Sequence, residues 1–119
     1  MTRKNSSTRI YIFWTCQNQE EATRIIHTLL EKRLIACASL FPQVKSIYWW
    51  QGKIEESREV KVILKTIRTH FRAIQKYIES SSSYETPEIV QVTIDDGSPR
   101  YLEWMLEATS LKNPLIKDC

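Results

Sequence analysis

The chain has 119 residues, of which 42% are hydrophobic and 26% charged, a size and balance typical of one globular domain with its own core. Its 17 basic and 14 acidic residues are interspersed and give a formal net charge of +3, so no stripe of one sign indicates a nucleic-acid or membrane partner. Three separated cysteines favour a reducing, cytoplasmic location, and no stretch reaches the roughly 18 apolar residues of a membrane span.

The first predicted elements are a polar tail, a strand and a helix. Apart from Met1, residues 1–8 lack apolar side chains whose burial would offset the entropy of ordering them, and they predict a disordered tail. Residues 9–16 are rich in β-branched and aromatic side chains and predict a strand. Asn18 and Glu21 are spaced as in a capping box, which indicates the start of a helix. Apolar residues then recur at helical spacing: Ala22, Ile25, Ile26, Leu29, Leu30 and Leu34.

A long hairpin is predicted next. Residues 35–50 and 53–68 indicate two strands, and Gly52 supplies the positive φ of the tight turn between them. The strand, helix and second strand form a β-α-β unit, whose strands should be parallel and whose crossover should be right-handed. In the second hairpin strand, alternating apolar residues predict one buried face: Val60, Val62 and Leu64.

A second helix, a last strand and a short third helix complete the chain. The second helix is predicted from Thr69 to the serine run 80–83, and the strand over residues 88–94. Ser98 is a candidate N-cap and Pro99 suits the first helical position. The residues expected to form the apolar faces of these two helices are Phe71, Ile74, Tyr77 and Ile78, and Tyr101, Trp104, Met105 and Ala108.

This order of elements predicts an α+β fold of the ferredoxin-like, split β-α-β type, with two helices on one face of an antiparallel sheet. The domain is predicted over residues 9–109, with a tail at 110–119. The hairpin is longer than one small domain needs, so its overhang is expected to pair with another chain. Tyr48, Trp49 and Trp50 lie at its tip, and such aromatic residues favour interface centres.

Four segments resemble, in the same order, the CutA family of divalent-cation tolerance proteins. They are residues 31–38 (EKRLIACA), 46–56 (SIYWWQGKIEE), 59–66 (EVKVILKT) and 84–89 (YETPEI). The resemblance implies a homotrimer assembled through the long hairpin strands, similar in architecture to the trimeric nitrogen-regulatory signalling proteins. It also implies a role in tolerance of divalent cations, copper above all, without a settled catalytic activity.

The resemblance also implies candidate metal ligands. Family members usually carry His-Pro where this chain has Ser82 and Ser83, and a cysteine proposed as a ligand in some members aligns with Trp14, two residues before Cys16. Glu88 matches the proposed constellation, so Cys16 and Glu88 are the candidate metal residues. Because Cys16 precedes a helix N-terminus, its thiol pKa is expected to be lowered.

The other cysteines and both histidines have simpler interpretations. Cys37 lies in an apolar run and is interpreted as a packed, inert thiol. Cys119 falls in the predicted tail and is assigned neither a packing nor a binding role. His27 and His70 lie on predicted helices, where a lone histidine is more often a solvated or core residue than a ligand.

The resemblance places Lys65, Tyr84 and Glu85, with Glu88, around a cleft between subunits where a small ligand or ion would sit. These residues can also be interpreted as having a purely structural role. Tyr84 and Pro87 would then fix the loop before the last strand, and Glu88 would pair with a lysine across the trimer interface, a contact that adds little stability.

Enzymatic and RNA-binding functions are not supported by motifs. The chain has no Ser-His-Asp spacing, glycine-rich phosphate loop or His-Glu-x-x-His run. RNA recognition motifs share this order of elements, and Tyr11 and Phe13 would suit base stacking, but residues 60–65 lack the Lys/Arg-Gly-aromatic run. The resemblance therefore implies a non-enzymatic protein of divalent-cation tolerance, copper above all, that acts as a trimeric scaffold and is a candidate for metal binding. The alternative is a trimeric signalling protein that senses a small molecule or protein partner in the clefts between subunits.

Overall fold

The structure is a computed structural model that describes residues 7–110. The predicted tail residues 1–6 and 111–119, including Cys119, lie outside this part of the chain. The elements, in chain order, are β1 (Arg9–Cys16), α1 (Gln19–Glu31), β2 (Cys37–Trp50), β3 (Lys53–Ile67), a 3-10 turn η1 (Arg68–His70), α2 (Phe71–Ser81), β4 (Ile89–Thr93) and α3 (Pro99–Ala108). The predicted order is confirmed. Within residues 7–110, no helix combines the length and apolar character needed to cross a bilayer.

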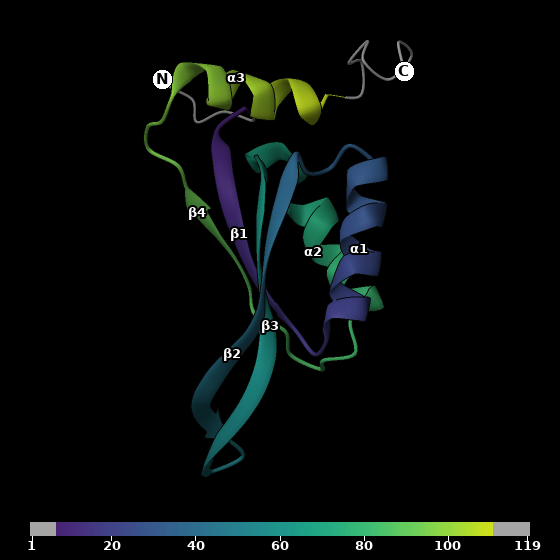
Figure 1. The fold of residues 1–119 in the computed structure, drawn as a ribbon, viewed down its shortest axis with the longest axis vertical. Coiled ribbons are helices and arrows are strands. Elements are labelled where there is room, and N and C mark those ends of the chain that lie inside the picture. The colour runs from purple at the N-terminus through teal and green to yellow at the C-terminus, as the bar shows by residue number, and fades with distance from the viewer. Residues whose placement is uncertain (1–6, 111–119) are drawn as a thin grey trace.

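The four strands form one sheet in the order β2-β3-β1-β4, and every neighbouring pair is antiparallel. Helices α1 and α2 lie together on one side of this sheet, and α3 crosses its end opposite the hairpin tip (Figure 1). Strands β1 and β2 run in the same direction, as predicted, but β3 lies between them. This insertion makes the β-α-β unit split, which confirms the ferredoxin-like fold.

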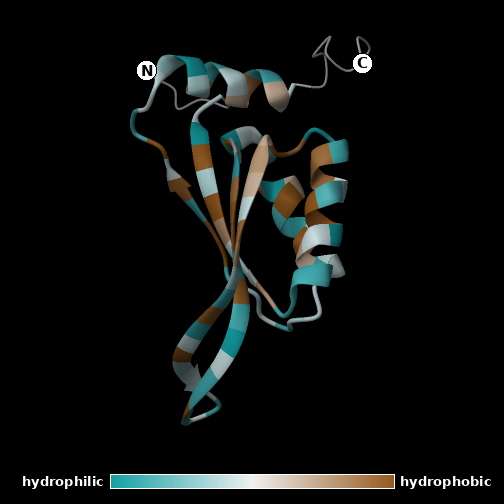
Figure 2. Cartoon of the chain, viewed as in Figure 1, coloured by the Kyte–Doolittle hydropathy of each residue, from teal (hydrophilic) through white to brown (hydrophobic). Residues whose placement is uncertain are grey.

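The core lies between the sheet and the α1–α2 layer. Alternate residues of β1 and β3 point into it, and Figure 2 shows apolar and polar residues alternating along β1. The three β3 residues predicted to form a buried face are at most 3% exposed. The core cluster comprises Ile10, Ile12, Trp14, Cys16, Ala22, Ile25, Ile26, Leu29, Ile35, Val60, Val62, Leu64, Phe71, Ile74 and Ile78.

Helix α1 begins and ends with recognisable caps. The Asn18 side chain accepts a hydrogen bond from the backbone N–H of Glu21 (2.8 Å), as the capping pattern predicted. At the other end, Arg33 adopts a positive φ of 61°, and the N–H groups of Arg33 and Leu34 bond to the carbonyls of Leu30 and Leu29. This is a Schellman arrangement. Of the apolar residues predicted at helical spacing, Leu30 is 37% exposed and Leu34 lies beyond the helix end at Glu31.

The hairpin turn has positive φ at both Gln51 (52°) and Gly52 (82°), which matches the right-handed twist of its strands. Strand β1 pairs with β3 only from Val60 to Ile67. Residues 44–50 of β2 and 53–59 of β3 therefore pair only with each other within the described chain. Figure 1 shows this part of the hairpin extending well past the helices. The predicted overhang is confirmed.

Helix α3 is held at the far end of the sheet by basic side chains. Arg9 donates to the Leu102 carbonyl (2.9 Å), and Arg33 donates to the Ala108 carbonyl (3.1 Å) at the helix C-terminus, where a cation is favourable. Met105 is fully buried beneath the helix. The predicted apolar face is only partly correct, because Tyr101 and Trp104 stack on each other at 5.5 Å and remain about 40% exposed.

Candidate functional site

Cys16, a candidate metal ligand, is a buried thiol at the end of β1. Its side chain is fully inaccessible, and its S–H lies 3.5 Å from Glu21 Oε2 and 3.7 Å from the Asn18 carbonyl oxygen. Burial, with a further contribution from the Glu21 carboxylate, raises the pKa of Cys16 to about 11, although backbone hydrogen bonds from Asn18 and Gln17 act to lower it. The expectation of a lowered pKa is wrong, because burial and a neighbouring negative charge outweigh the potential at the start of α1.

Glu21 connects the start of α1 to the loop before β4. Its Oε2 accepts the backbone N–H of Ser83 (2.9 Å) as well as the Cys16 S–H. Ser83 Oγ donates to Gln17 Oε1 (2.8 Å), and the Tyr84 N–H donates to Ser82 Oγ (3.2 Å). Burial alone would raise the pKa of Glu21, but the hydrogen bonds from Ser83, Cys16 and Ser82 outweigh it and lower that pKa. The two serines at the family's His-Pro positions thus form part of a hydrogen-bonded link.

Glu88, the second candidate metal residue, forms an ion pair within its own chain. Its Oε1 lies 3.3 Å from Lys61 Nζ, and that ammonium lies 5.5 Å from the centre of the Phe13 ring. Lys61 alternates with the buried Val60 and Val62, so this pair lies on the face of the sheet away from α1 and α2. The structural interpretation predicted that Glu88 pairs with a lysine across the trimer interface. Its partner is a lysine, Lys61, but this lysine belongs to the same chain.

Cys16 and Glu88 are therefore on opposite faces of the sheet. Cys16 belongs to the core beneath the helices, whereas Glu88 is paired with Lys61 on the other face of the sheet. Among residues 7–110, no three or more His, Cys, Asp or Glu side chains gather closely enough to hold a metal ion. One chain does not bring the two predicted ligands into a common coordination sphere.

The predicted cleft residues also lie apart. Lys65 Nζ donates to Ser39 Oγ (3.0 Å) on the neighbouring strand β2. Tyr84 lies beside Glu59; burial and the hydrogen bond to Glu59 raise its pKa above the usual range. Glu85 is exposed. Glu59 and Lys65 are six residues apart along β3, a distance of roughly 20 Å at 3.3 Å per residue. Because Tyr84 lies beside Glu59, it is far from Lys65.

Among residues 7–110, the hairpin tip carries the most exposed of the large apolar side chains. Tyr48, Trp49 and Trp50 are 40%, 71% and 42% exposed. The register places Trp49 opposite Ile54, and Ile47 lies two residues before Trp49 on the same face, with Ile47 and Ile54 about 60% exposed. Three large apolar residues thus form a row on one face of the overhang. An exposed apolar row of this kind indicates an interaction surface.

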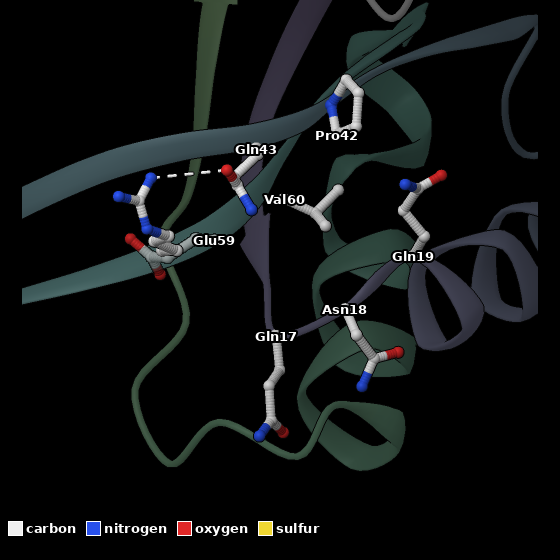
Figure 3. Close-up of a pocket in the computed structure, with 8 residues that line it drawn as sticks. Gln17, Asn18, Gln19, Pro42, Gln43, Glu59 and Val60 are labelled. Atoms are coloured by element: carbon white, nitrogen blue, oxygen red, sulfur yellow. Dashed lines mark hydrogen bonds between the residues drawn. The ribbon is translucent and has the colours of Figure 1, made fainter.

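A polar hollow of about 240 Å³ lies between the start of α1 and the base of the hairpin (Figure 3). A bulge in β2 between Phe41 and Val44 places Pro42 and Gln43 at its rim. Arg58 Nη1 donates to Gln43 Oε1 (3.4 Å) there. The lining residues are Gln17, Asn18, Gln19, Pro42, Gln43, Arg58, Glu59 and Val60.

Comparison with known proteins identifies the family of this chain. The sequence pattern of the CutA1 divalent ion tolerance proteins matches residues 10–108. The chain belongs to the CutA1 family. It is 39% identical over 100 residues to the divalent-cation tolerance protein CutA of Pyrococcus horikoshii, covering 84% of this chain and 97% of that one. It is 40% identical over 97 residues to protein CutA of Mus musculus, covering 82% and 55%.

Solved CutA structures share the fold. The periplasmic divalent cation tolerance protein CutA of Archaeoglobus fulgidus superposes with a TM-score of 0.83 at 37% identity, covering 86% of this chain and 99% of that one. CutA1 of Oryza sativa gives the same TM-score at 30% identity, covering 89% and 99%. The chain spans about half the length of the mouse relative and nearly all of the archaeal ones.

The CutA name implies a divalent cation, and the two predicted ligands do not fit a shared site within one chain. A soft metal such as copper(I) requires a thiolate, whereas the Cys16 thiol is buried and protonated at neutral pH. Glu88 is already paired with Lys61. We therefore assign these residues a structural role in the isolated chain.

Metal titration tests this assignment. We expect Cys16→Ser to leave the affinity of the reduced protein for copper(I), delivered from a competing chelator, unchanged within about twofold. Cys119→Ser, which removes the thiol in the C-terminal region, is the matched control. Calorimetry that shows one tight site per chain, lost in Cys16→Ser and kept in Cys119→Ser, would contradict the assignment.

Two residues of this region were not singled out from the sequence. Glu21 was interpreted only as part of a helix cap, although its side chain joins Cys16 to Ser83. Glu59 received no role, although it contacts Tyr84 and lines the hollow. The available signal for Glu59 was its place at the start of the family-like segment 59–66. No local signal identifies the long-range partner of Glu21.

Proposed function

We propose that the protein acts as a non-enzymatic homotrimer in tolerance of divalent cations, copper among them. The cation role is supported by family membership and by the names of relatives such as the divalent-cation tolerance protein of Pyrococcus horikoshii. The trimer is supported by the hairpin overhang, which carries the proposal. Its exposed apolar row is large, and an isolated two-stranded ribbon is at best marginally stable in water.

Partner chains would stabilise the overhang in two ways. Its outer strand edges offer unpaired backbone groups to a further strand. The row formed by Ile47, Trp49 and Ile54 would bury several apolar side chains, each contributing about 1.5–3 kcal/mol when removed from water.

The oligomeric state tests this proposal directly. We expect light scattering during size-exclusion chromatography to give three times the 14.1 kDa mass of one chain. Trp49→Glu should shift the protein to monomers, because it places a charge in the row, whereas Leu30→Glu changes a partly exposed leucine of α1 and should remain trimeric. A monomeric wild-type protein, or a trimeric Trp49→Glu variant, would contradict the proposed assembly.

The same variants test the cation role in cells. A host that lacks its own CutA-family protein and is sensitive to copper should grow at higher copper concentrations when it expresses the wild type or Leu30→Glu. Trp49→Glu should fail to restore growth if the trimer is the active form. Absence of rescue by the wild type, expressed at comparable levels, would argue against a role in copper tolerance.

A signalling trimer with ligands in inter-subunit clefts is the alternative function. Lys65 and Tyr84 lie at different levels of one sheet, so a cleft containing both would need side chains from two chains. Lys65→Ala and Tyr84→Phe should then weaken the response to a ligand without changing copper tolerance. The cytoplasmic location inferred from the cysteines stays a prediction, and the Archaeoglobus fulgidus relative is named as periplasmic.

A further inference from the structure

The facing sides of α1 and α2 carry a cluster of cations and hydroxyls that the proposed function does not use. Arg24, Thr28 and the C-cap residue Lys32 follow at intervals of four and lie along one stripe of α1. Tyr77 and Ser81 have the same spacing on α2, which packs beside α1 (Figure 1). We propose that these five residues bind a phosphate group, either free or as the monoester of a small molecule. The inference goes beyond the proposed function, because the cluster belongs to the helix layer of one chain.

Tyr77 lies at the centre of this cluster. The Lys32 ammonium is 5.5 Å from the centre of the Tyr77 ring. Hydrogen bonds from the Thr28 and Ser81 side chains, with smaller contributions from the charges of Lys32 and Arg24, lower the pKa of Tyr77 and outweigh the opposing effect of burial. Each of these four groups stabilises negative charge at the phenol oxygen. The surroundings of that oxygen therefore suit an anion.

Tyr84 and Tyr101 have the opposite surroundings. Burial and the neighbouring Glu59 carboxylate raise the pKa of Tyr84, and burial is the largest cause of the raised pKa of Tyr101. Neither of these tyrosines lies between two cations of a neighbouring helix. The electropositive environment is therefore a property of the α1–α2 cluster and not of tyrosines in this fold generally.

The two cations of the cluster are available to a ligand. Within residues 7–110, neither Arg24 nor Lys32 forms an ion pair with a carboxylate, whereas Lys61 is paired with Glu88. Both side chains are exposed. They are eight residues apart, about 12 Å along the helix axis, and Thr28 lies halfway between them. A guanidinium binds phosphate oxygens through two parallel N–H donors, and an ammonium supplies a second positive charge.

The charge and the donors of the cluster select a phosphate group among small anions. A phosphate monoester carries a charge of about −1.5 to −2 at neutral pH and offers three acceptor oxygens, which match two cations and several hydroxyl donors. A monocarboxylate carries half of that charge and should bind more weakly. Because the cluster is exposed, solvent and salt screen its charges, and we expect a dissociation constant on the order of 1 mM.

Titration of the full-length protein at pH 8 and low salt tests the inference. Inorganic phosphate and glycerol 3-phosphate should produce saturable shifts of backbone amide resonances centred on residues 24, 28, 32, 77 and 81. Arg24→Gln and Lys32→Gln should each weaken phosphate binding at least about fivefold, and acetate should bind more weakly than phosphate by a similar factor. Tighter binding of glycerol 3-phosphate than of phosphate would identify a phosphorylated small molecule as the ligand. Equal or weaker binding would identify free phosphate.

Lys76→Gln is the matched control. Lys76 is an exposed cation of α2 that precedes Tyr77, and successive residues of a helix point about 100° apart, so this change should leave phosphate binding unchanged. Absence of saturable shifts up to about 20 mM phosphate would overturn the inference. Equal losses of affinity in Lys76→Gln and Lys32→Gln would also overturn it and indicate diffuse attraction to a basic surface. All of these variants leave the hairpin overhang intact, so the outcome is independent of the proposed trimer.

Discussion

Replacing Trp14 by alanine is expected to lower the free energy of unfolding by about 3–5 kcal/mol. The indole is fully buried in the middle of β1. Its backbone neighbours are Val62 on β3 and Ile89 on β4, so the side chain lies between two strand pairs and the helix layer. Alanine would leave a cavity there that rigid strands on both sides cannot close.

Trp14→Phe should cost much less, under about 1.5 kcal/mol. Within the described residues, the indole Nε1 is buried and has no hydrogen-bond partner. Phenylalanine keeps most of the apolar volume and removes a donor that is costly to bury unpaired. A phenylalanine variant as unstable as the alanine variant would show that the N–H group contributes a bond.

Urea unfolding followed by circular dichroism measures both effects. All samples should have the same protein concentration, because the unfolding of an oligomer depends on it. Trp104→Ala removes the same side chain from α3, where it is 40% exposed, and it should cost clearly less than Trp14→Ala. This control separates the effect of burial from that of losing apolar volume.

Features set by neighbours along the chain could be predicted from the sequence. Alternation of apolar and polar residues gave the buried face of β3, and Gly52 located the hairpin turn. The helical stripe of α1 was predicted correctly for Ala22, Ile25, Ile26 and Leu29, but Leu30 is 37% exposed and Leu34 lies beyond the helix, because spacing alone does not reveal that the helix ends at Glu31. The positive φ of Arg33 that ends it is usually adopted by glycine.

The candidate site depended on contacts between distant segments, which the sequence does not specify. The position of Cys16 before α1 predicted a lowered pKa, whereas burial, and further the Glu21 carboxylate, raise it. The separation of Cys16 from Glu88 follows from the pairing of β1 with both β3 and β4. Neither that pairing nor the lysine partner of Glu88 can be read from local patterns.

The Cys16 thiol is expected to make stability fall at alkaline pH. Because its pKa is raised from 9.0 to about 11 in the folded state, its contribution is fully present below pH 9 and is lost as the pH rises toward 11. A shift of this size corresponds to about 2–3 kcal/mol. Between pH 9 and 11, the free energy of unfolding should therefore fall less for Cys16→Ala than for the wild type. Cys37→Ala, which removes a half-buried thiol, is the control and should follow the wild type.

Removing the carboxylate next to this thiol should make it reactive. In a Cys37→Ser, Cys119→Ser background, we expect Glu21→Gln to speed the reaction of Cys16 with iodoacetamide at pH 8 at least tenfold. The substitution removes a negative charge that raises the thiol pKa and weakens the bond that holds Ser83 over the start of α1. Glu20→Gln, which changes an exposed carboxylate of the same helical turn, should leave the rate unchanged. Equal rates in both variants would show that burial beneath the helices, rather than Glu21, keeps Cys16 inert.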